Sequence, residues 1–567
     1  MPSAPEILSD AVECALGAPA MIRPADPKFG DYQANGVMAV AKQRGENPRK
    51  LAEQIIGKID VSNVSEPPTV AGAGFINFRL KPSFVVEQLT AAARDERLGV
   101  AKVVRPKTIV VDFSSPNVAK PMHVGHIRST IIGDCLARVS RFLGHRVITD
   151  NHIGDWGTQF GMLIVGWKKF RDDVALGKDP MAELERLYKL VNARDELRDE
   201  AKAELVKLQQ GDAENRQIWQ RMIELSEIEF GKIYDRLGIK FDHTLGESFY
   251  SGALPTVVED LKARGLATLS EGALCVFLNE AGLPKTPFIV QKSDGAFNYA
   301  TTDLATLKYR VEHFHADEIL YVVGAPQATH FKQLFAIAGR WGYNKVELRH
   351  VAFGSVLGED GKLLRTRSGE TVRLSDLLDE AEERALTVVT EKNPELPAAT
   401  QKQIARAVGI GAVKYADLSQ NRTTDYVFSW SKMLAMTGNT APYMQYAYVR
   451  VQSIFRKADA GRVTSRDAAS GDTAYSIRLE HPAELDLAKH LLRFGESLQE
   501  VLNDDKPNWL TSYLYDLTAK FSAFYENCPV LQSAEPTRSS RLQLCRLTAD
   551  VIKRGLDLLG IDVIEQM

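Results

Sequence analysis

Hydrophobic and polar positions change period near residue 110 in a way that is typical of a parallel sheet. Residues 108–112 are β-branched apolar residues bounded by charges, which predicts a buried strand. Residues 126–143 then place apolar side chains at helical spacing, at Ile127, Ile131, Leu136, Val139 and Leu143. A second apolar run follows at 147–149. This order predicts a doubly wound parallel sheet, which binds ligands at the carboxyl ends of its strands.

The rest of the chain divides by its patterns into further segments. Residues 1–100 mix a helical stretch with an alternating strand at 72–79, which predicts a small α/β domain. Residues 101–430 form the sheet domain, and within it a charged helical pattern from 179 to 238 predicts an amphipathic helical hairpin, inserted at about 165–240. A coiled-coil partner site is the alternative for that pattern. Residues 431–567 read as amphipathic helices and predict an all-α domain.

Composition narrows the class of protein. The 567 residues are 44% hydrophobic and 25% charged, as in a globular protein with several cores. No run is long and apolar enough to span a membrane, and the N-terminus lacks the cationic region of a secretory signal, so we expect a cytoplasmic protein. The five cysteines have no paired spacing, which argues against a zinc site or a disulfide framework.

Net charge gives no support for nucleic-acid binding. The formal charge is −3, so an RNA partner would be held by local basic faces and by shape.

The loop between the first strand and its helix has the residues of a phosphate site. His123 and His126 lie three apart with Gly125 between them, so both imidazoles can face one way while a ligand approaches the backbone closely. Cationic donors at a helix N-terminus suit the charge that develops on a transferring phosphoryl group. Two histidines near a helix start can equally be caps or buried polar residues.

The whole run 114–129, Ser-Ser-Pro-Asn-Val-Ala-Lys-Pro-Met-His-Val-Gly-His-Ile-Arg-Ser, resembles the HIGH signature of class I aminoacyl-tRNA synthetases, in the form found in arginyl-tRNA synthetases. The resemblance extends over essentially the entire chain. It implies a Rossmann-like catalytic domain with an α/β N-terminal domain and an all-α C-terminal domain. It also implies that His123, His126 and Gly125 act in catalysis, and that Lys120 replaces a lysine missing from a later loop.

Three segments in the sheet domain converge on a guanidinium group. Glu247 follows a loop, and Tyr299 and Asp303 lie four apart on one face of a predicted helix. The third segment is an apolar run that ends with Gln327. Two carboxylates and an aromatic wall match the planar, always charged fork of arginine. Taken singly, these residues could be a surface charge, a core aromatic and a helix cap. In the family that the chain resembles, the matching positions bind the arginine side chain, and Ser115, Asn117, His126 and Gln327 match positions near its backbone groups or the adenylate.

A basic loop at 356–369 is expected to close over ATP and neutralise the departing pyrophosphate, although a solvated basic hairpin is the alternative. It stands where class I enzymes have their KMSKS loop and departs from that pattern, since residues 364–368 read Leu-Arg-Thr-Arg-Ser. The resemblance assigns Arg367 to catalysis. It assigns the following residues to ATP binding: Pro121, His123, Gly125, His126, Gly324, Gln327, Arg365, Thr366 and Arg367.

The terminal domains supply the predicted tRNA contacts. An exposed Phe beside an Asn can stack on and hydrogen-bond an unpaired base, and Phe75 and Asn77 match family positions that read the D-loop. A hairpin with a core Phe is the alternative. Gln33 and Asn35 are further candidates in the N-terminal domain. The C-terminal helices resemble the family's anticodon-binding domain, where we place Tyr448. A helical bundle with these tyrosines in its core is the alternative.

These observations predict an ATP-dependent ligase that activates L-arginine as an adenylate and transfers it to the terminal ribose of tRNA(Arg). ATP is expected to bring Mg²⁺ on its phosphates, without a dedicated protein metal site, and the protein to act as a monomer. The resemblance further implies that tRNA is needed for activation. Two alternatives remain, another class I synthetase or nucleotidylyltransferase, and a non-catalytic tRNA-binding paralogue.

Overall fold

The computed structural model describes residues 2–278, 280, 282–365, 371–459 and 477–565. These residues form two compact units. The larger unit contains Lys102–Tyr446, Leu498–Ser512 and the stretch from Gly555 onward. The smaller unit contains the chain up to Ala101, Ala447–Ser497 and Tyr513–Arg554. The three-domain division with boundaries near 100 and 430 stays a prediction.

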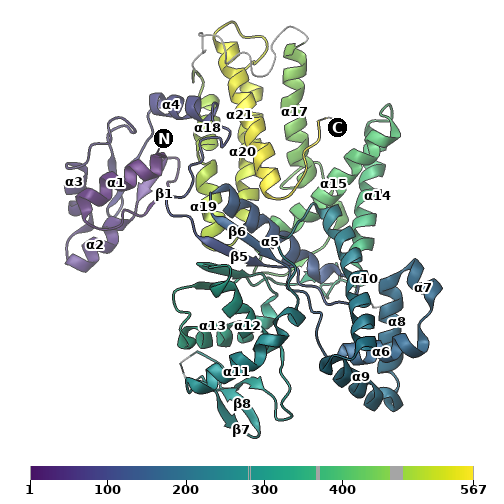
Figure 1. The fold of residues 1–567 in the computed structure, drawn as a ribbon. Coiled ribbons are helices and arrows are strands. Elements are labelled where there is room, and N and C mark those ends of the chain that lie inside the picture. The colour runs from purple at the N-terminus through teal and green to yellow at the C-terminus, as the bar shows by residue number, and fades with distance from the viewer. Residues whose placement is uncertain (1, 279, 281, 366–370, 460–476, 566–567) are drawn as a thin grey trace. The chain divides into compact units, whose positions relative to one another are not determined.

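A four-stranded parallel sheet is the centre of the larger unit (Figure 1). Its strands are β5 (Thr108–Asp112), β6 (Arg146–Asp150), β10 (Glu318–Tyr321) and β11 (Glu347–His350), in the order β11-β10-β5-β6. After β5, the chain adds β6 on one side of that strand and later adds β10 and β11 on the other side. This reversal between β5 and β10 is the switch point at which such sheets bind ligands.

Helices cover this sheet and supply much of its core. They include α5 (Val124–Phe142), α11 (Leu254–Ala263), α12 (Tyr299–Glu312) and α13 (Ala328–Trp341), with the short turns η2 (Glu247–Ala253) and η3 (Ala325–Gln327). Val110, Leu304 and Leu334 are fully buried in one cluster, which joins the sheet to α12 and α13. Asn298 begins α12, because its side chain accepts hydrogen bonds from the amides of residues 300 and 301.

The insertion between β6 and α11 is a group of several helices, whereas the sequence predicted a hairpin. It contains α6 (Gln159–Phe170), α7 (Asp173–Lys178), α8 (Pro180–Asn192), η1 (Asp195–Leu197), α9 (Arg198–Gln210) and α10 (Ala213–Leu237). Phe160, Leu184 and Met222 share one apolar core across three of these helices. The break near residue 195 was not evident from a helical period that continues on both sides of it.

A small antiparallel sheet in the larger unit was not predicted. Its strands are β7 (Thr268–Ser270), β8 (Ala273–Val276) and β9 (Phe288–Gln291), in the order β7-β8-β9. Glu271 and Gly272 both adopt positive φ between β7 and β8, which makes the turn between them tight. Strands of three or four residues are too short to give a clear alternating pattern.

The remaining elements are mostly helical. They are β12 (Val356–Leu357), α14 (Leu374–Lys392), α15 (Ala398–Leu418), β13 (Tyr426–Val427), α16 (Trp430–Met433), α17 (Ala441–Asp459), α18 (Pro482–Leu492), α19 (Phe494–Asp504), α20 (Asn508–Asn527) and α21 (Thr537–Leu558). The predicted α/β class with a helical C-terminal region is confirmed.

The N-terminal residues form an antiparallel sheet with helices. The strands are β1 (Ile22–Pro24), β2 (Tyr32–Ala34), β3 (Thr69–Ala71) and β4 (Phe75–Phe78), in the order β1-β2-β4-β3, and the helices are α1 (Ala4–Leu16), α2 (Gly36–Arg44), α3 (Pro48–Ile56) and α4 (Pro82–Ala92). Within the same unit, Asp31 forms an ion pair with Lys489 of α18 at 2.7 Å, and the Tyr32 hydroxyl donates to Glu496 of α19.

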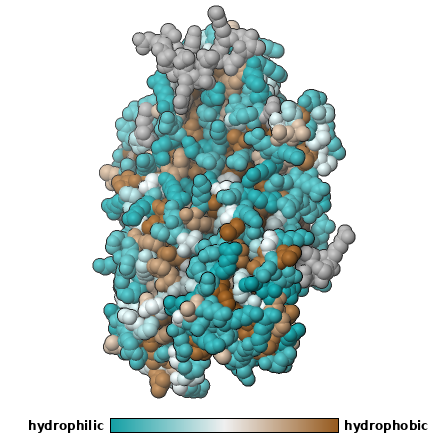
Figure 2. Space-filling view, turned by 45° about the vertical axis from the view of Figure 1, so that its right-hand side comes forward, coloured by the Kyte–Doolittle hydropathy of each residue, from teal (hydrophilic) through white to brown (hydrophobic). Residues whose placement is uncertain are grey.

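Figure 2 shows a largely hydrophilic face on which hydrophobic residues are scattered in small groups. Within the described residues, we find no helix with the length and apolar character needed to cross a bilayer.

Candidate active site

The loop after β5 is held open by its own backbone and by buried hydroxyl groups. Ser114 and Ser115 both have positive φ, which turns the chain sharply away from the strand. The Ser114 hydroxyl lies 2.8 Å from the hydroxyl of Tyr234, and the side-chain oxygen of Asn151 accepts from the amide of Ser115 at 3.0 Å. These bonds fix the loop between β5 and α5 before any ligand is present.

His123 and His126 begin α5 as a reciprocal cap. Nδ1 of His123 accepts from the amide of Gly125 at 3.1 Å, and Nδ1 of His126 accepts from the amide of His123 at 3.0 Å. The two rings lie 4.0 Å apart between centroids. A Cβ on Gly125 would lie 2.8 Å from the His123 ring, so this position requires glycine.

Both imidazoles are neutral, in contrast to the cationic donors expected from the sequence. Burial lowers the pKa of His126 to about 3, with the neighbouring His123 as a further cause. Burial, and then Lys120, lowers the pKa of His123. Since Nδ1 of each ring accepts a hydrogen bond, the proton of the neutral ring is on Nε2. The pair therefore offers two N–H donors, and Lys120, exposed beside His123, is the cation of this loop.

A fully buried arginine, which the sequence analysis missed, pairs with both acids at the ends of β5 and β6. Arg310 of α12 forms 2.8 Å ion pairs with Asp112 and with Asp150. The Ser115 hydroxyl donates to the second carboxylate oxygen of Asp112 at 3.1 Å. Arg310 lies seven residues after Asp303 on the same helix, and this spacing was the available signal. These two acids are thus occupied by the protein's own cation.

Glu247 and Asp303, the two predicted arginine-binding carboxylates, are close enough to repel each other. Burial, with the charges of Asp303 and Asp155, raises the pKa of Glu247 to about 7, whereas the charge of His152 opposes the shift. Two acids that repel each other in this way favour a cationic ligand between them. The structure therefore brings together residues that lie 56 positions apart in the sequence.

Asp155, also missed from the sequence, fixes the segment that presents Glu247. Its carboxylate accepts from the amide of Ser248 at 2.8 Å and from the hydroxyl of the same residue. A Cβ on Gly246 would lie 2.4 Å from this carboxylate, so only glycine allows the close approach. The amide of Glu247 donates to the carbonyl of Ile153 at 3.1 Å.

Tyr299 and His330 complete the cluster around Asp303, and the sequence analysis also missed His330. Nε2 of His330 lies 2.6 Å from a carboxylate oxygen of Asp303, and its ring centroid lies 5.1 Å from that of Tyr299. Tyr299 is 61% exposed at the start of α12, so its ring is open to a ligand. His330 lies three residues after Gln327, a helical spacing that was visible in the sequence.

The other predicted ligand contacts lie at loops on the same edge of the sheet. Asn117 is exposed and pairs with Gly154, while Gly324 pairs with Phe353. Gln327 is exposed in η3, directly after β10. Pro121 is half-buried beside His123. No bound ligand tests these assignments, and they stay predictions.

The residues that follow the basic loop are hydrogen-bonded to the residues at the start of α5. The amide of Val124 donates to the carbonyl of Val372 at 3.0 Å, and the amide of Leu374 donates to the carbonyl of Met122 at 2.9 Å. Arg365 of the basic loop is exposed. Thr366 and Arg367 lie outside the described residues. The segment after the basic loop is therefore fixed against the start of α5.

The predicted tRNA contacts of the smaller unit differ in their accessibility. Phe75 is partly exposed on the strand face opposite Ile76 and Phe78, whereas Asn77 is 2% exposed. Gln33 pairs with Asn77 across β2 and β4, and its side chain donates to Asn35 at 2.6 Å. The structure differs for Tyr448, which is 3% exposed and packs in the helical core. A base could not stack on it, because α17 turns this ring inward.

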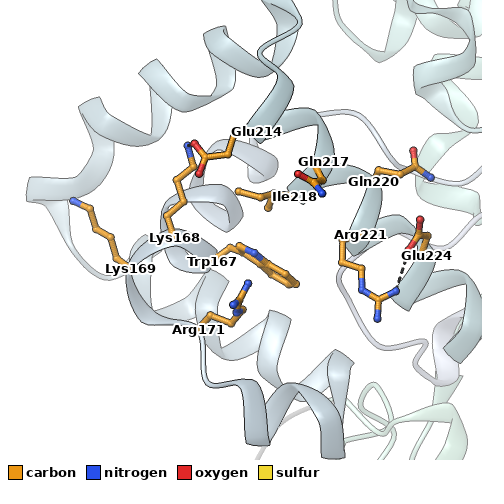
Figure 3. A pocket seen from close by; sticks show the side chains of 10 residues that line it. All are labelled: Trp167, Lys168, Lys169, Arg171, Glu214, Gln217, Ile218, Gln220, Arg221 and Glu224. Carbon is orange, nitrogen blue, oxygen red and sulfur yellow. Dashed lines mark hydrogen bonds and ion pairs between the residues drawn. The ribbon is translucent and has the colours of Figure 1, made fainter.

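An open pocket of about 800 Å³ lies between α6 and α10 of the insertion, and its lining contains none of the predicted site residues (Figure 3). Arg171 lies over the ring of Trp167 at 4.8 Å. Lys168 is paired with Glu214, and Arg221 with Glu224. Lys169 pairs with Glu200 of α9 and Arg171 with Asp173 of α7, so the cations of this pocket are compensated by acids of the insertion.

Models of three protein families match the chain. The model described as tRNA synthetases class I (R), catalytic domain, matches residues 88–430, which defines the class: this is a class I aminoacyl-tRNA synthetase. An arginyl tRNA synthetase N terminal domain matches residues 6–80, and a DALR anticodon binding domain matches 444–567. The chain belongs to the arginyl-tRNA synthetase family, and the predicted resemblance is confirmed.

Full-length relatives and solved structures agree with this assignment. The chain is 50% identical to the arginine–tRNA ligase of Synechococcus elongatus, over 98% of this chain and 96% of the relative. It is 49% identical to that of Salmonella agona, over 99% of both. The Plasmodium falciparum arginyl-tRNA synthetase structure matches with a TM-score of 0.86 at 32% identity, over 99% of this chain and 98% of that one. The Thermus thermophilus structure matches with a TM-score of 0.84 at 25% identity, over the whole of both chains.

Proposed function

We propose that this chain is an arginine–tRNA ligase that works in two steps. The carboxylate of L-arginine attacks the α-phosphorus of ATP, which gives arginyl-adenylate and releases pyrophosphate. A ribose hydroxyl at the 3′ end of tRNA(Arg) then attacks the activated carbonyl and releases AMP. The single observation that carries this proposal is the mutual repulsion of Glu247 and Asp303, two acids that lie close together in one site of a class I synthetase.

The substrate side chain is expected to lie between the two carboxylates. A guanidinium group has five donors in a plane, and Glu247 and Asp303 supply acceptors for both of its edges. Tyr299 offers an open aromatic face. Asp112 and Asp150 cannot serve as alternatives, because Arg310 occupies them. Ser115, Asn117 and Gln327 are proposed to contact the backbone groups of the amino acid.

Activation is proposed to depend on positioning and electrostatic stabilisation. The Nε2–H groups of His123 and His126 would donate to the phosphate oxygens, and Lys120 would add the positive charge that two neutral rings cannot supply. Gly125 allows the nucleotide to approach the backbone of α5. Gly324, Gln327, Pro121 and Arg365 are proposed to line the ATP site.

Mg²⁺ is proposed to bind to the phosphates of ATP. Among the described residues, no group of three or more His, Cys, Asp and Glu side chains could hold a metal ion. Asp112 and Asp150, at the carboxyl ends of β5 and β6, are both ion-paired with Arg310. We therefore assign no protein ligand to the ion.

The tRNA is proposed to contact both ends of the chain. Phe75 is proposed to stack on a D-loop base, with Gln33 on β2, Asn77 on β4 and Asn35 at the start of α2 as further contacts. The helices matched by the anticodon-binding model would contact the anticodon. We propose that the protein acts as a monomer in the cytoplasm.

The proposal is tested by ATP–pyrophosphate exchange and by charging of tRNA(Arg) with the purified full-length chain. We expect exchange that depends on arginine, and charging of tRNA(Arg) with arginine but not with lysine. Exchange supported by another amino acid would identify a different class I synthetase. Tight tRNA binding without exchange, with and without tRNA in the assay, would identify a non-catalytic paralogue.

A further inference from the structure

Asp303 has one hydrogen-bonding partner among the described residues, and this partner is a histidine. Nε2 of His330 lies 2.6 Å from Oδ2 of Asp303. The His330 side chain is 11% exposed, and that of Asp303 is 25% exposed. One carboxylate oxygen is therefore bound by the protein, and the other is left for a ligand.

The His330 ring is held in place by its neighbours. It stacks on Phe288 of β9, with ring centroids 5.5 Å apart and an interplanar angle of 17°. Phe288 is itself 3% exposed, in the core that joins the small antiparallel sheet to α12. On another side lies Tyr299, with centroids 5.1 Å apart. A ring fixed in this way gives its hydrogen bond a fixed direction.

Asp303 differs from the other carboxylates of the site because its hydrogen-bonding partner is a histidine and not an arginine. Asp112 and Asp150 share Arg310, a permanent cation that would repel a cationic ligand. The His330 imidazole binds only one carboxylate oxygen of Asp303, so the other oxygen remains available to a ligand. The neighbouring Glu247 adds a second negative charge.

We propose that His330 is a positioning residue for arginine recognition, which binds Oδ2 of Asp303 through Nε2–H and thereby directs Oδ1 toward the guanidinium group. This inference rests on the proposed function. It assigns His330 an effect on the affinity for arginine, without contact to the reacting atoms or to ATP. The ring stack with Phe288 supports this role by fixing the direction of the bond.

Two matched variants separate the hydrogen bond from the ring stack. His330→Phe keeps an aromatic ring against Phe288 and removes the donor, whereas His330→Gln keeps an N–H donor and removes the ring. We expect His330→Phe to raise the KM for arginine by about tenfold, the usual effect of losing a hydrogen bond to a charged group, with kcat and the KM for ATP near wild type. His330→Gln should stay close to wild type in all three constants.

A control and a double-mutant cycle complete the experiment. His313→Phe, an exposed histidine stacked on Tyr309 at 4.3 Å, should leave all three constants unchanged. In the background of Asp303→Asn, His330→Phe should add little further loss, because the two residues act through one bond. Should His330→Phe fold poorly, as judged by its melting temperature, His330→Leu gives the same test.

The outcomes are distinct. An unchanged arginine KM in the donor-free variants, or additive losses in the cycle, would overturn the inference. Equal loss of arginine and ATP binding in both His330→Phe and His330→Gln would indicate a purely structural role and would also overturn it. Failure of the wild-type chain to show any arginine-dependent exchange would instead contradict the proposed function.

Discussion

Arg310 and Asp150 form a 2.8 Å ion pair in which both side chains are fully buried. The same guanidinium also binds Asp112, so one cation on α12 joins the carboxyl ends of β5 and β6. Desolvation of three charges is offset only if all of them remain paired. The edge of the sheet that presents the active-site loops thus depends on one side chain.

We therefore expect Arg310→Met to destabilise the larger unit strongly. Removal of the arginine leaves two buried carboxylates without a partner, at a cost of about 3–5 kcal/mol. Urea unfolding followed by tryptophan fluorescence measures the effect. Arg264→Met is the control, because its pair with Asp260 is partly exposed and should be worth less than about 1 kcal/mol. Equal effects of the two substitutions would contradict the role assigned to Arg310.

Arginine binding should depend on pH through Glu247. Burial and nearby acids raise the pKa of this carboxyl to about 7 in the free protein, so it is mostly protonated at pH 6 and mostly ionised at pH 8. A bound guanidinium favours the ionised form, so the Kd for arginine should fall about tenfold between these pH values, with release of a proton. Calorimetry in two buffers of different ionisation enthalpy measures both quantities.

The control for this prediction is His152→Asn, because His152 is a titratable group whose charge lowers the pKa of Glu247. The pH dependence should persist in His152→Asn and disappear in Glu247→Gln. The reverse result would assign the titration to the histidine.

His126 should act as a neutral donor in adenylate formation. Because burial lowers its pKa to about 3, the rate at saturating arginine should show no inflection near pH 6.5. His126→Ala should slow single-turnover adenylate formation by about a hundredfold, the usual cost of losing one preorganised donor, while tRNA binding persists. An inflection near pH 6.5 that His126→Ala abolishes would show that the charged imidazole is the active form.

Phe75 is expected to contribute stacking energy to tRNA binding. Phe75→Ala should weaken the affinity for tRNA(Arg) by about 1–3 kcal/mol, the range found for base–aromatic stacking. Filter binding at fixed salt measures this loss. Phe78→Leu alters the fully buried face of the same strand and should lower the melting temperature without a comparable effect on affinity. Unchanged binding by Phe75→Ala would remove this residue from the tRNA surface.

The sequence alone predicts an element when the pattern that defines it lies within the element's own residues. β5 and α5 follow from their apolar spacing, and a helix that carries Tyr299 and Asp303 was also predicted; all three elements are present in the structure. The position of Glu247 near Asp303 followed from the family resemblance, since no periodicity links two segments so far apart.

Other features depend on burial, which a single sequence does not determine. The charge of His126 is set by the core around it, and Tyr448, predicted to contact tRNA, is buried in the structure. Arg310 gains its carboxylate partners only where α12 packs on β5 and β6, and His330 gains its partner only where α13 packs on α12. The strands β7 to β9 were missed because each is only three or four residues long.

Arginine affinity in Asp303→Asn tests the central claim most directly, because the substitution removes one charge and preserves the size of the side chain. Calorimetry with the full-length chain should show binding weakened by at least about 2 kcal/mol relative to wild type, with ATP binding retained. Asp294→Asn, an exposed acid before α12, should bind arginine normally. Wild-type arginine affinity in Asp303→Asn would contradict the paired-carboxylate site.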